Sequence, residues 1–366
     1  MSRLLIIILT LTTTFTTNAF DRENLMKAWS SSVVIRGYTD DGLAYGSGVV
    51  VAKDKVVTNC HVLRKTKSPW VSFGDTSFPV TGVQADRWHD LCLLSVFNLP
   101  VEPVPLGNSK NLKKGQEIVG IGHSGGAPVA LTTGGNVIAT YDFEGENIIL
   151  SSAKFRMGAS GSGLFDLKGN LIGINTFKTT GYGNYYSLPA DWIKPLMKKE
   201  VETVFPINGK ALWEEDEDKK PYFLKIAIPK TKKNWAELEL VTKEWVEHEP
   251  NNTEAWYELG YAYEKLNKVA DALVAYDKAL EIDQNNSDAL LREAVIYKKK
   301  GDENKVADAL VAYDKALEID QNNSDALLRE AVIYKKKGDE KKVSQLQSKL
   351  DDVDPNKAWI LKNNKY

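Results

Sequence analysis

Three short strings in the first half of the chain carry residues that could act together in nucleophilic catalysis. A histidine lies in TNCHVL at His61, a carboxylate opens DLCLL at Asp90, and a serine lies between glycines in GASGSGLFD at Ser160. A serine hydroxyl is a weak nucleophile until an imidazole takes its proton, and a carboxylate can fix the tautomer of that imidazole. The set therefore predicts acyl transfer, with Ser160 as nucleophile, His61 as general base and Asp90 as its orienting acid.

These strings lie in a region of short β-rich runs that extends from about residue 21 to residue 206. Runs such as KVVTN, WVSFG, EIVGIG and NIILSS have the composition of strands, and DLKGN between two apolar runs is typical of a hairpin turn. Many short strands with turn signals between them predict an all-β barrel or sandwich. A helix is expected to close the region at about residues 190–199, with Pro195 as a candidate kink.

The order His, Asp, Ser, at separations of 29 and 70 residues, resembles that of the trypsin-like serine proteases, most closely the bacterial HtrA-like branch. The similarity extends over most of residues 40–200 and includes GSG before the histidine and LIGINT after the serine. It implies a chymotrypsin-like double β-barrel over residues 20–206. It also implies serine endopeptidase activity on protein or peptide substrates.

Two of the three assignments have a local rival. Ser162 lies near Ser160, but only Ser160 begins the family's S-G-x-G-L alignment, in which the nucleophile precedes Gly161 and the strand restarts at Leu164. Asp86 lies near Asp90, but Asp90 opens the apolar run LCLLSV, as the acid of the family does, whereas Asp86 lies in a polar turn. The resemblance therefore favours Ser160 and Asp90.

The glycine two residues before the nucleophile suits an oxyanion hole. Gly158 would let the backbone bend so that its N–H and that of Ser160 point at one spot, where charge develops in the transition state. By the same resemblance, residues 154–157 and 181–188 are expected to wall the primary substrate pocket. The candidate pocket residues in these segments are Lys154, Phe155, Arg156, Met157, Tyr186 and Ser187.

The chain departs from the digestive trypsin-like enzymes just before the nucleophile, where they carry an acid and this chain has Ala159. Activity is therefore expected without a freshly cut N-terminus. The remaining histidines are His89, His123 and His248, and they lack the spacing of metal ligands, so neither a metal nor a cofactor is expected. His123 lies in GIGHSGG, a glycine-rich loop that could border the substrate cleft.

Cys60 and Cys92 are the only cysteines of the chain, and they flank the two residues expected to pair. Because His61 and Asp90 must form a hydrogen bond in a triad, their chain segments must lie close, which brings the cysteines near bonding range. In an oxidising compartment this predicts a disulfide. The alternative is a pair of buried thiols packed under the triad.

The first residues have the pattern of a secretory signal peptide. A short basic start precedes an apolar run from Leu4 to Leu11, and small polar residues close on Ala19. The run is shorter than the ~20 residues that span a membrane, so a signal peptide over residues 1–19 and a periplasmic or secreted protein without a membrane span are expected. The net charge of -2 gives no sign of a nucleic-acid partner.

The second half of the chain changes character. Residues 207–233 hold an acidic stretch and lysine-rich segments without a sustained period, which predicts a linker. Residues 267–303 then recur letter for letter at 304–340. The pattern W-x-x-L-G-x-x-Y, followed by A-x-x-x-Y-x-x-A, resembles the tetratricopeptide repeat (TPR), which implies a solenoid of helix pairs. The expected units are a degenerate half repeat at 234–252, repeats at 253–286, 287–323 and 324–357, and a tail at 358–366.

The repeats suggest a protein partner as well as a substrate. On the first helix of each pair, residues at positions i, i+4 and i+7 share one face. In its position, this face resembles the concave binding surface of TPR domains. This face is expected to bind an extended or acidic peptide, and its candidate residues are Tyr257, Tyr261, Glu264, Leu291, Val295, Lys298, Leu328, Val332 and Lys335, with Lys299 and Lys336 beside them. The alternative function is an inactive protease-like scaffold whose repeats bind a protein, against which the complete triad and Gly158 argue.

Overall fold

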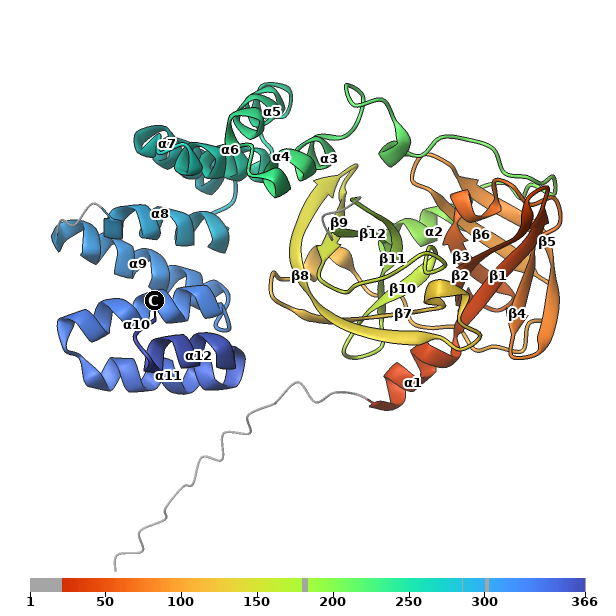
Figure 1. Cartoon of the computed structure of the whole chain (residues 1–366), viewed down its shortest axis with the longest axis horizontal. Helices are drawn as coiled ribbons and strands as arrows, with labels where there is room; N and C mark the ends of the chain where they lie inside the picture. Colours follow the sequence, from red (N-terminus) through yellow and green to blue (C-terminus); the bar gives the residue numbers. More distant parts are fainter. Residues whose placement is uncertain (1–21, 180–183, 285, 300–302, 366) are drawn as a thin grey trace, which may run out of the picture.

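The computed structural model describes residues 22–179, 184–284, 286–299 and 303–365, and these form two β-barrels followed by a helical region (Figure 1). The expected signal peptide at residues 1–19 lies outside the described residues. Within the described ranges, no helix is both long and apolar enough to cross a membrane.

The first barrel follows α1 (Arg22–Ser30) and closes in the order β1-β2-β3-β6-β5-β4, with every neighbouring pair antiparallel. Its strands are β1 (Ser32–Thr39), β2 (Gly42–Ala52), β3 (Lys55–Asn59), β4 (Trp70–Phe73), β5 (Thr76–Asp86) and β6 (Leu91–Val96). Apolar side chains from these strands, Val33, Ile35, Val56 and Leu94 among them, fill the interior.

The second barrel closes in the order β10-β11-β12-β9-β8-β7 and is also antiparallel throughout. Its strands are β7 (Glu117–Gly122), β8 (Leu131–Phe143), β9 (Glu146–Ser151), β10 (Ser162–Asp166), β11 (Leu171–Lys178) and β12 (Tyr185–Pro189). The DLKGN turn joins β10 to β11, with Gly169 at a φ of +80°. The closing helix is shorter than expected: η4 (Ala190–Trp192) and α2 (Ile193–Leu196). The two barrels confirm the predicted double-barrel fold.

The segment expected to be a linker is folded. It forms η5 (Leu212–Glu214), α3 (Tyr222–Lys225) and α4 (Ala227–Lys232), and it buries Ile207, Leu212, Phe223 and Ile226. Elements of three to six residues are too short to show a helical period in sequence. The prediction of a linker over residues 207–233 is therefore wrong.

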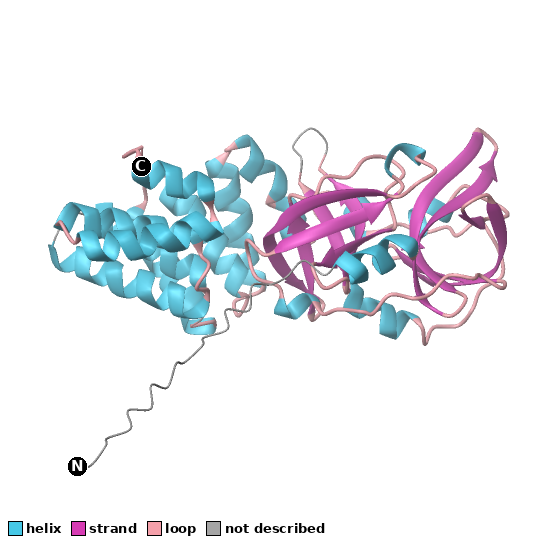
Figure 2. Ribbon diagram, turned by 90° about the horizontal axis from the view of Figure 1, so that it is seen from below, coloured by secondary structure: helices cyan, strands magenta, loops and turns pink. Residues whose placement is uncertain are grey.

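The helical region continues as a stack of helices, in which each helix packs against the next one along the chain (Figure 2). Its helices are α5 (Trp235–His248), α6 (Thr253–Lys265), α7 (Val269–Ile282), α8 (Ser287–Lys299), α9 (Glu303–Ile319), α10 (Ser324–Lys337), α11 (Glu340–Val353) and α12 (Pro355–Lys362). Each of the three full repeats expected from the sequence thus contains two helices. Gly260 permits the close approach of α6 and α7, because a Cβ there would lie 2.6 Å from the ring of Tyr276. The expected tail is partly helical, and Leu361 of α12 is buried.

One aromatic side chain connects the second barrel to the helical region. The ring of Phe223 on α3 lies 5.6 Å from that of Tyr141, 5.5 Å from that of Phe143 and 6.2 Å from that of Tyr186, all on the second barrel. The same apolar cluster continues through α5 and α6, where it includes Leu238. The barrel and the first helices of the repeats therefore share one core.

This shared core predicts a large effect of truncation at its centre. Phe223→Ala should lower the free energy of unfolding by about 3–5 kcal/mol, because it leaves a cavity between the barrel and α3. Denaturant unfolding of the full chain measures this. Phe97→Ala is the matched control, since Phe97 is 67% exposed on the first barrel and should cost well under 1 kcal/mol. Equal stability losses in the two variants would contradict the shared core.

Candidate active site

The three candidate triad residues come from both barrels. His61 lies in η1 (Cys60–Leu63) directly after β3, and Asp90 lies in the turn between β5 and β6 of the same barrel. Ser160 lies just before β10 of the second barrel, and its carbonyl accepts a hydrogen bond of 2.8 Å from the backbone N–H of Ser47 on β2. The base and the acid therefore belong to one barrel and the serine to the other.

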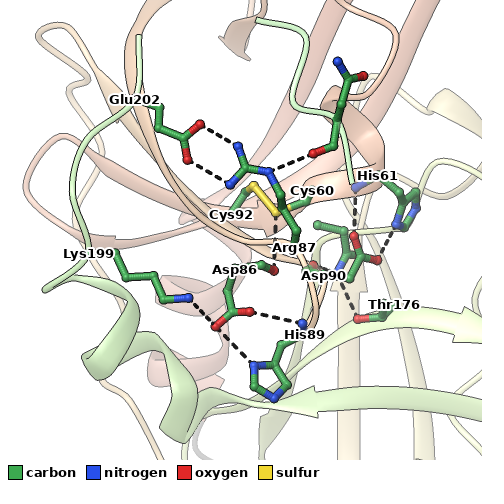
Figure 3. Close-up of a disulfide and its surroundings, with 12 residues drawn as sticks. Cys60, His61, Asp86, Arg87, His89, Asp90, Cys92, Thr176, Lys199 and Glu202 are labelled. Carbon is green, nitrogen blue, oxygen red and sulfur yellow. Dashed lines mark hydrogen bonds and ion pairs between the residues drawn. A yellow bond between two sulfur atoms is a disulfide. The ribbon is translucent and has the colours of Figure 1, made fainter. Parts of the chain in front are cut away.

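The structure brings His61 and Asp90 together (Figure 3). Oδ2 of Asp90 lies 2.6 Å from Nδ1 of His61, and Oδ1 accepts a hydrogen bond of 2.8 Å from the backbone N–H of His61. Asp90 is fully buried, whereas the His61 side chain keeps 22% exposure. Two hydrogen bonds from one residue to a buried carboxylate fix the ring tautomer with Nδ1 protonated and leave Nε2 as the basic nitrogen.

Backbone geometry fixes the position of Asp90. Its φ is +55°, in the left-handed region that non-glycine residues seldom adopt. Its carbonyl accepts hydrogen bonds from the backbone N–H of Cys60 at 3.2 Å and from Nδ2 of Asn59 at 2.9 Å. Nδ2 of Asn59 also donates to the hydroxyl of Thr176 on β11. Asn59 therefore holds the acid-bearing turn and joins the two barrels at the site.

The rival acid, Asp86, has other partners. Its carboxylate lies 3.1 Å from Nδ1 of His89 and 2.8 Å from Nζ of Lys199 (Figure 3). Burial alone would raise the pKa of Asp86, but the hydrogen bonds from His89 and Lys199 hold it well below its ordinary value. Asp86 is therefore the centre of a structural ion cluster beside the site.

The two candidate serines differ in their surroundings. Ser162 is buried, and its hydroxyl accepts a hydrogen bond of 2.9 Å from Nδ2 of Asn175. Ser160 is partly exposed, and among the residues that the structure describes its hydroxyl makes no hydrogen bond, either to His61 or to another group. The structure thus forms the acid–base half of the triad and gives the hydroxyl of Ser160 no partner from the described residues.

Gly46 on β2 lets the histidine and serine segments approach each other. A Cβ at this position would lie 2.6 Å from Cγ1 of Val62 and 3.3 Å from the carbonyl oxygen of Ser160. Val62 directly follows His61, so the backbone of Gly46 separates the base-bearing turn from the serine-bearing turn. A side chain there would push the two turns apart.

Hydrogen bonds to two carbonyl groups hold the peptides directly before Ser160. The carbonyl of Met157 accepts a hydrogen bond of 2.6 Å from the N–H of Gly125, and that of Ala159 accepts one of 2.8 Å from the N–H of Ser162. In a planar trans peptide the N–H points opposite to the carbonyl, so the N–H groups of Gly158 and Ser160 point away from these donors. Within the described residues, neither N–H donates to an acceptor.

Strand β2 supports this turn with two side chains. The hydroxyl of Ser47 donates to the carbonyl of Gly158 at 2.8 Å and accepts from the backbone N–H of His123 at 2.9 Å. The φ of Gly158 is +90°, and a Cβ there would lie 2.6 Å from the ring of Tyr45. His123 is a buried residue behind the turn, and burial lowers the pKa of its imidazole. The roles of Tyr45 and Ser47 had no signal in the sequence beyond the GSG motif.

A small cavity of about 10 Å³ lies beside the serine turn and is lined in part by Lys154, Phe155 and Ala159. Of the other expected pocket residues, Arg156 and Met157 are exposed. Tyr186 and Ser187 are wrong as pocket residues: Tyr186 stacks on Phe177 in the core, and the hydroxyl of Ser187 donates to Oδ1 of Asn175. Residues 181–183 of the expected pocket wall lie outside the described residues.

A further residue lies beside the triad, in the segment 207–233 for which the sequence had suggested a linker. The indole N–H of Trp213 donates to Oδ2 of Asp90 at 3.2 Å. Its ring lies edge-on to the imidazole of His61, with the ring centroids 5.5 Å apart. The neighbouring Glu214 forms an ion pair with Arg64. A tryptophan directly before an acidic run was the only sequence signal for this contact.

The expected partner-binding face of the repeats is mostly covered. The side chains of Tyr257, Leu291, Val295 and Val332 are buried within the packing of the helices. Tyr261 and Leu328 are partly buried, and Nζ of Lys335 donates to the carbonyl of Leu361 on α12. The side chains of Lys298 and Lys299 lie outside the described residues. The four buried residues are therefore wrong as a binding surface, because their apolar side chains form the contacts between helices.

The predicted disulfide between Cys60 and Cys92 is present, with the two Cα atoms 5.0 Å apart (Figure 3). Cys92 lies on β6, which pairs with β3 directly before Cys60. The bond therefore joins the turn that carries His61 to the strand that follows Asp90.

Removing this cross-link should destabilise the first barrel. The disulfide spans a sequence separation of 32, for which the chain-entropy relation gives roughly 3–4 kcal/mol. The variant Cys60→Ser/Cys92→Ser should lose about this much free energy of unfolding relative to the oxidised protein. Thiol titration of denatured, non-reduced protein is the second measurement, and two free thiols would contradict the disulfide.

Comparisons with known proteins match the β-barrel part and the helical part of the chain separately. A trypsin-like peptidase domain matches residues 46–174. The TPR domain of cytochrome c-type biogenesis protein H matches residues 223–357, and this match begins within the segment that the sequence had suggested as a linker.

Several curated proteins are similar to the protease part. The periplasmic serine endoprotease DegP of Salmonella typhimurium is 32% identical over 174 residues, which cover 44% of this chain and 36% of DegP. The mitochondrial serine protease HTRA2 of Drosophila willistoni is 32% identical over 175 residues, which cover 43% of this chain and 38% of HTRA2. The anti-sigma-I factor RsgI9 of Acetivibrio thermocellus is 29% identical over 196 residues, or 51% of this chain and 27% of RsgI9. The chain thus spans about a third of the length of these relatives.

Solved structures give matches of similar extent. The active form of the Rv3671c protease from M. tuberculosis is 24% identical, with a TM-score of 0.46, and the match covers 52% of this chain and 89% of that chain. The matches to families and curated proteins assign the parts of the molecule. The chain contains a trypsin-like peptidase domain related to the HtrA and DegP proteases, followed by a C-terminal TPR domain.

Proposed function

We propose that the protein is a serine endopeptidase that hydrolyses peptide bonds in exported proteins. The observation that carries the proposal is the pairing of His61 with the buried carboxylate of Asp90. The serine turn supports it, because the N–H groups of Gly158 and Ser160 lie on peptides whose carbonyls are already held by other donors. The relatives DegP and HTRA2 are named as serine proteases.

Each group has a defined role in the proposed reaction. Nε2 of His61 takes the proton of Ser160 as its Oγ attacks the substrate carbonyl, and the buried carboxylate of Asp90 stabilises the imidazolium that forms. The N–H groups of Gly158 and Ser160 donate to the oxyanion, each worth about 3 kcal/mol in the transition state. His61 then protonates the leaving amine, and water hydrolyses the acyl-enzyme by the same steps in reverse.

The TPR domain gives the proposal its second part. TPR helix pairs form extended surfaces that bind peptides, and here they share a core with the second barrel. We expect them to recruit a protein partner or a substrate to the catalytic domain. Export fits the signal-peptide pattern at residues 1–19 and the disulfide, because such bonds persist in oxidising compartments.

One observation favours the alternative, an inactive scaffold whose repeats bind a protein. Across the described residues, no hydrogen bond joins the hydroxyl of Ser160 to His61. Such bonds often tighten only when substrate binds, so the open contact is also compatible with an active enzyme. Chemical labelling of the serine separates the two functions.

A fluorophosphonate probe should label the protein at Ser160 and inhibit hydrolysis of an unfolded protein such as casein. Ser160→Ala should abolish both labelling and hydrolysis while leaving the thermal unfolding temperature unchanged, because only the nucleophilic oxygen is removed. Ser162→Ala is the matched control and should still be labelled. Absence of labelling in the wild type would favour the scaffold, and equal loss in Ser162→Ala would contradict the choice of nucleophile.

Activity should not depend on a newly cut N-terminus. The residue before the nucleophile, Ala159, is 1% exposed and has no carboxylate to pair with an inserted α-amino group. Protein that starts at Phe20 and protein with a short tag before Phe20 should therefore turn over a peptide substrate at the same rate. Turnover that appears only after the tag is cleaved would show that an N-terminal amine is required.

A further inference from the structure

Residues 207–214, which we call the clamp segment, lie against the chain on both sides of the candidate acid and base. The backbone N–H of Leu212 donates to the carbonyl of Trp88 at 3.0 Å, and Nε of Arg87 donates to the carbonyl of Asn208 at 2.8 Å. Glu214 forms its ion pair with Arg64. The clamp segment therefore contacts the residues just before Asp90 and just after His61.

Three interactions place the side chain of Trp213 within this segment. Its indole N–H donates to Oδ2 of Asp90, its edge lies against the ring of His61, and its face stacks on Phe177 at 5.6 Å between centroids. Leu212 beside it is fully buried. The indole is therefore held by His61 and Asp90 of the first barrel and by Phe177 of the second barrel, and the buried Leu212 anchors the adjacent backbone.

The indole supplies one of the few donors available to the buried carboxylate. Among the described residues, the carboxylate oxygens of Asp90 are bonded by the N–H of His61, by Nδ1 of His61 and by Nε1 of Trp213. The hydroxyl of Thr176, on the neighbouring strand, donates instead to the carbonyl of Ile174 at 2.8 Å. Within the part of the chain that the structure describes, Trp213 is thus the one donor to this carboxylate that comes from outside the His61 segment.

We propose that Trp213 is a positioning residue for the triad, through which the clamp segment fixes the carboxylate of Asp90 toward His61. Oδ2 is shared by the indole and by Nδ1 of His61, so the indole holds the carboxylate in the orientation that the imidazole needs. A hydrogen bond to a buried charged group is stronger than one between neutral groups. The proposal rests on the proposed endopeptidase function.

The clamp segment also links the triad to the TPR domain. Eight residues beyond Glu214, the chain enters α3, whose Phe223 packs in the core shared by the second barrel and the first repeat helices. The structural support of the acid therefore comes from the stretch of chain that joins the catalytic domain to the repeats.

Trp213→Phe tests the proposal, because it removes the N–H donor, together with the five-membered ring that carries it, and keeps an aromatic ring at this position. It should lower kcat for a peptide substrate by about tenfold or more, which is the scale of one hydrogen bond to a charged group. KM should change by less than twofold, because the indole holds the acid and not the substrate. The acid limb of the pH profile of kcat/KM should also move. A kcat within twofold of the wild type, a faster turnover, or a change confined to KM would overturn the proposal.

Trp88→Phe is the matched control. Its indole N–H also donates to a carboxylate, but to that of Glu144, at 2.9 Å, and Trp88 contacts the clamp segment through its backbone carbonyl, which the substitution leaves in place. This variant should keep wild-type kcat and the wild-type pH profile. An equal loss in Trp88→Phe and Trp213→Phe would overturn the proposal, since it would show a general effect of removing an indole.

A measurement that does not depend on turnover keeps the two proposals separate. The Nδ1 proton of His61, observed by NMR in the full chain, should shift in Trp213→Phe and stay in place in Trp88→Phe. If the wild type is not labelled by fluorophosphonate, the proposed function fails, and this resonance alone decides whether Trp213 positions the acid. An unchanged resonance in Trp213→Phe would overturn the positioning role.

Discussion

The burial of one carboxylate sets the requirements for the rest of the candidate site. An ionised carboxyl group without solvent needs donors for its oxygens, and Asp90 receives them from the backbone and ring of His61 and from Trp213. Its left-handed backbone is held by Asn59 and Cys60. The disulfide between Cys60 and Cys92 then closes the loop that contains His61 and Asp90. These contacts together keep the imidazole in one orientation, which is what general-base chemistry requires.

Strand β2 is the second constraint, because it joins the half of the site on the first barrel to the half on the second. Its Gly46 lets the His61 and Ser160 segments approach, and its Ser47 bonds both the carbonyl of Ser160 and, through its hydroxyl, that of Gly158. A serine turn carried by one barrel is thus positioned by a strand of the other. The geometry of the serine turn therefore depends on the contact between the barrels as well as on the turn itself.

Much of this could be predicted from the sequence, because it depends on local patterns. Glycine-punctuated β-runs predicted an all-β barrel or sandwich, and helical spacing predicted the repeats. The resemblance to the trypsin-like proteases predicted the double barrel and the triad, whose His61–Asp90 pair and nearby disulfide the structure forms. The clamp segment could not be found in this way, since its helical elements are too short for a period and its contacts lie over 100 residues away in the chain. The prediction of the TPR binding face was wrong for a related reason. Spacing places Leu291 and Val332 on corresponding faces of α8 and α10, but only the packing shows that neighbouring helices cover these faces.

The central claim is that His61, Asp90 and Ser160 form one catalytic unit with the two N–H groups of the serine turn. A crystal structure of the protein after reaction with a fluorophosphonate tests this most directly. The account predicts phosphorus bonded to Oγ of Ser160 and one phosphonyl oxygen within hydrogen-bonding distance of both the Gly158 and Ser160 N–H groups. It also predicts that Nε2 of His61 lies next to the modified serine while Nδ1 keeps its bond to Asp90. Phosphorus on another residue, or a phosphonyl oxygen that lies away from both N–H groups, would contradict it.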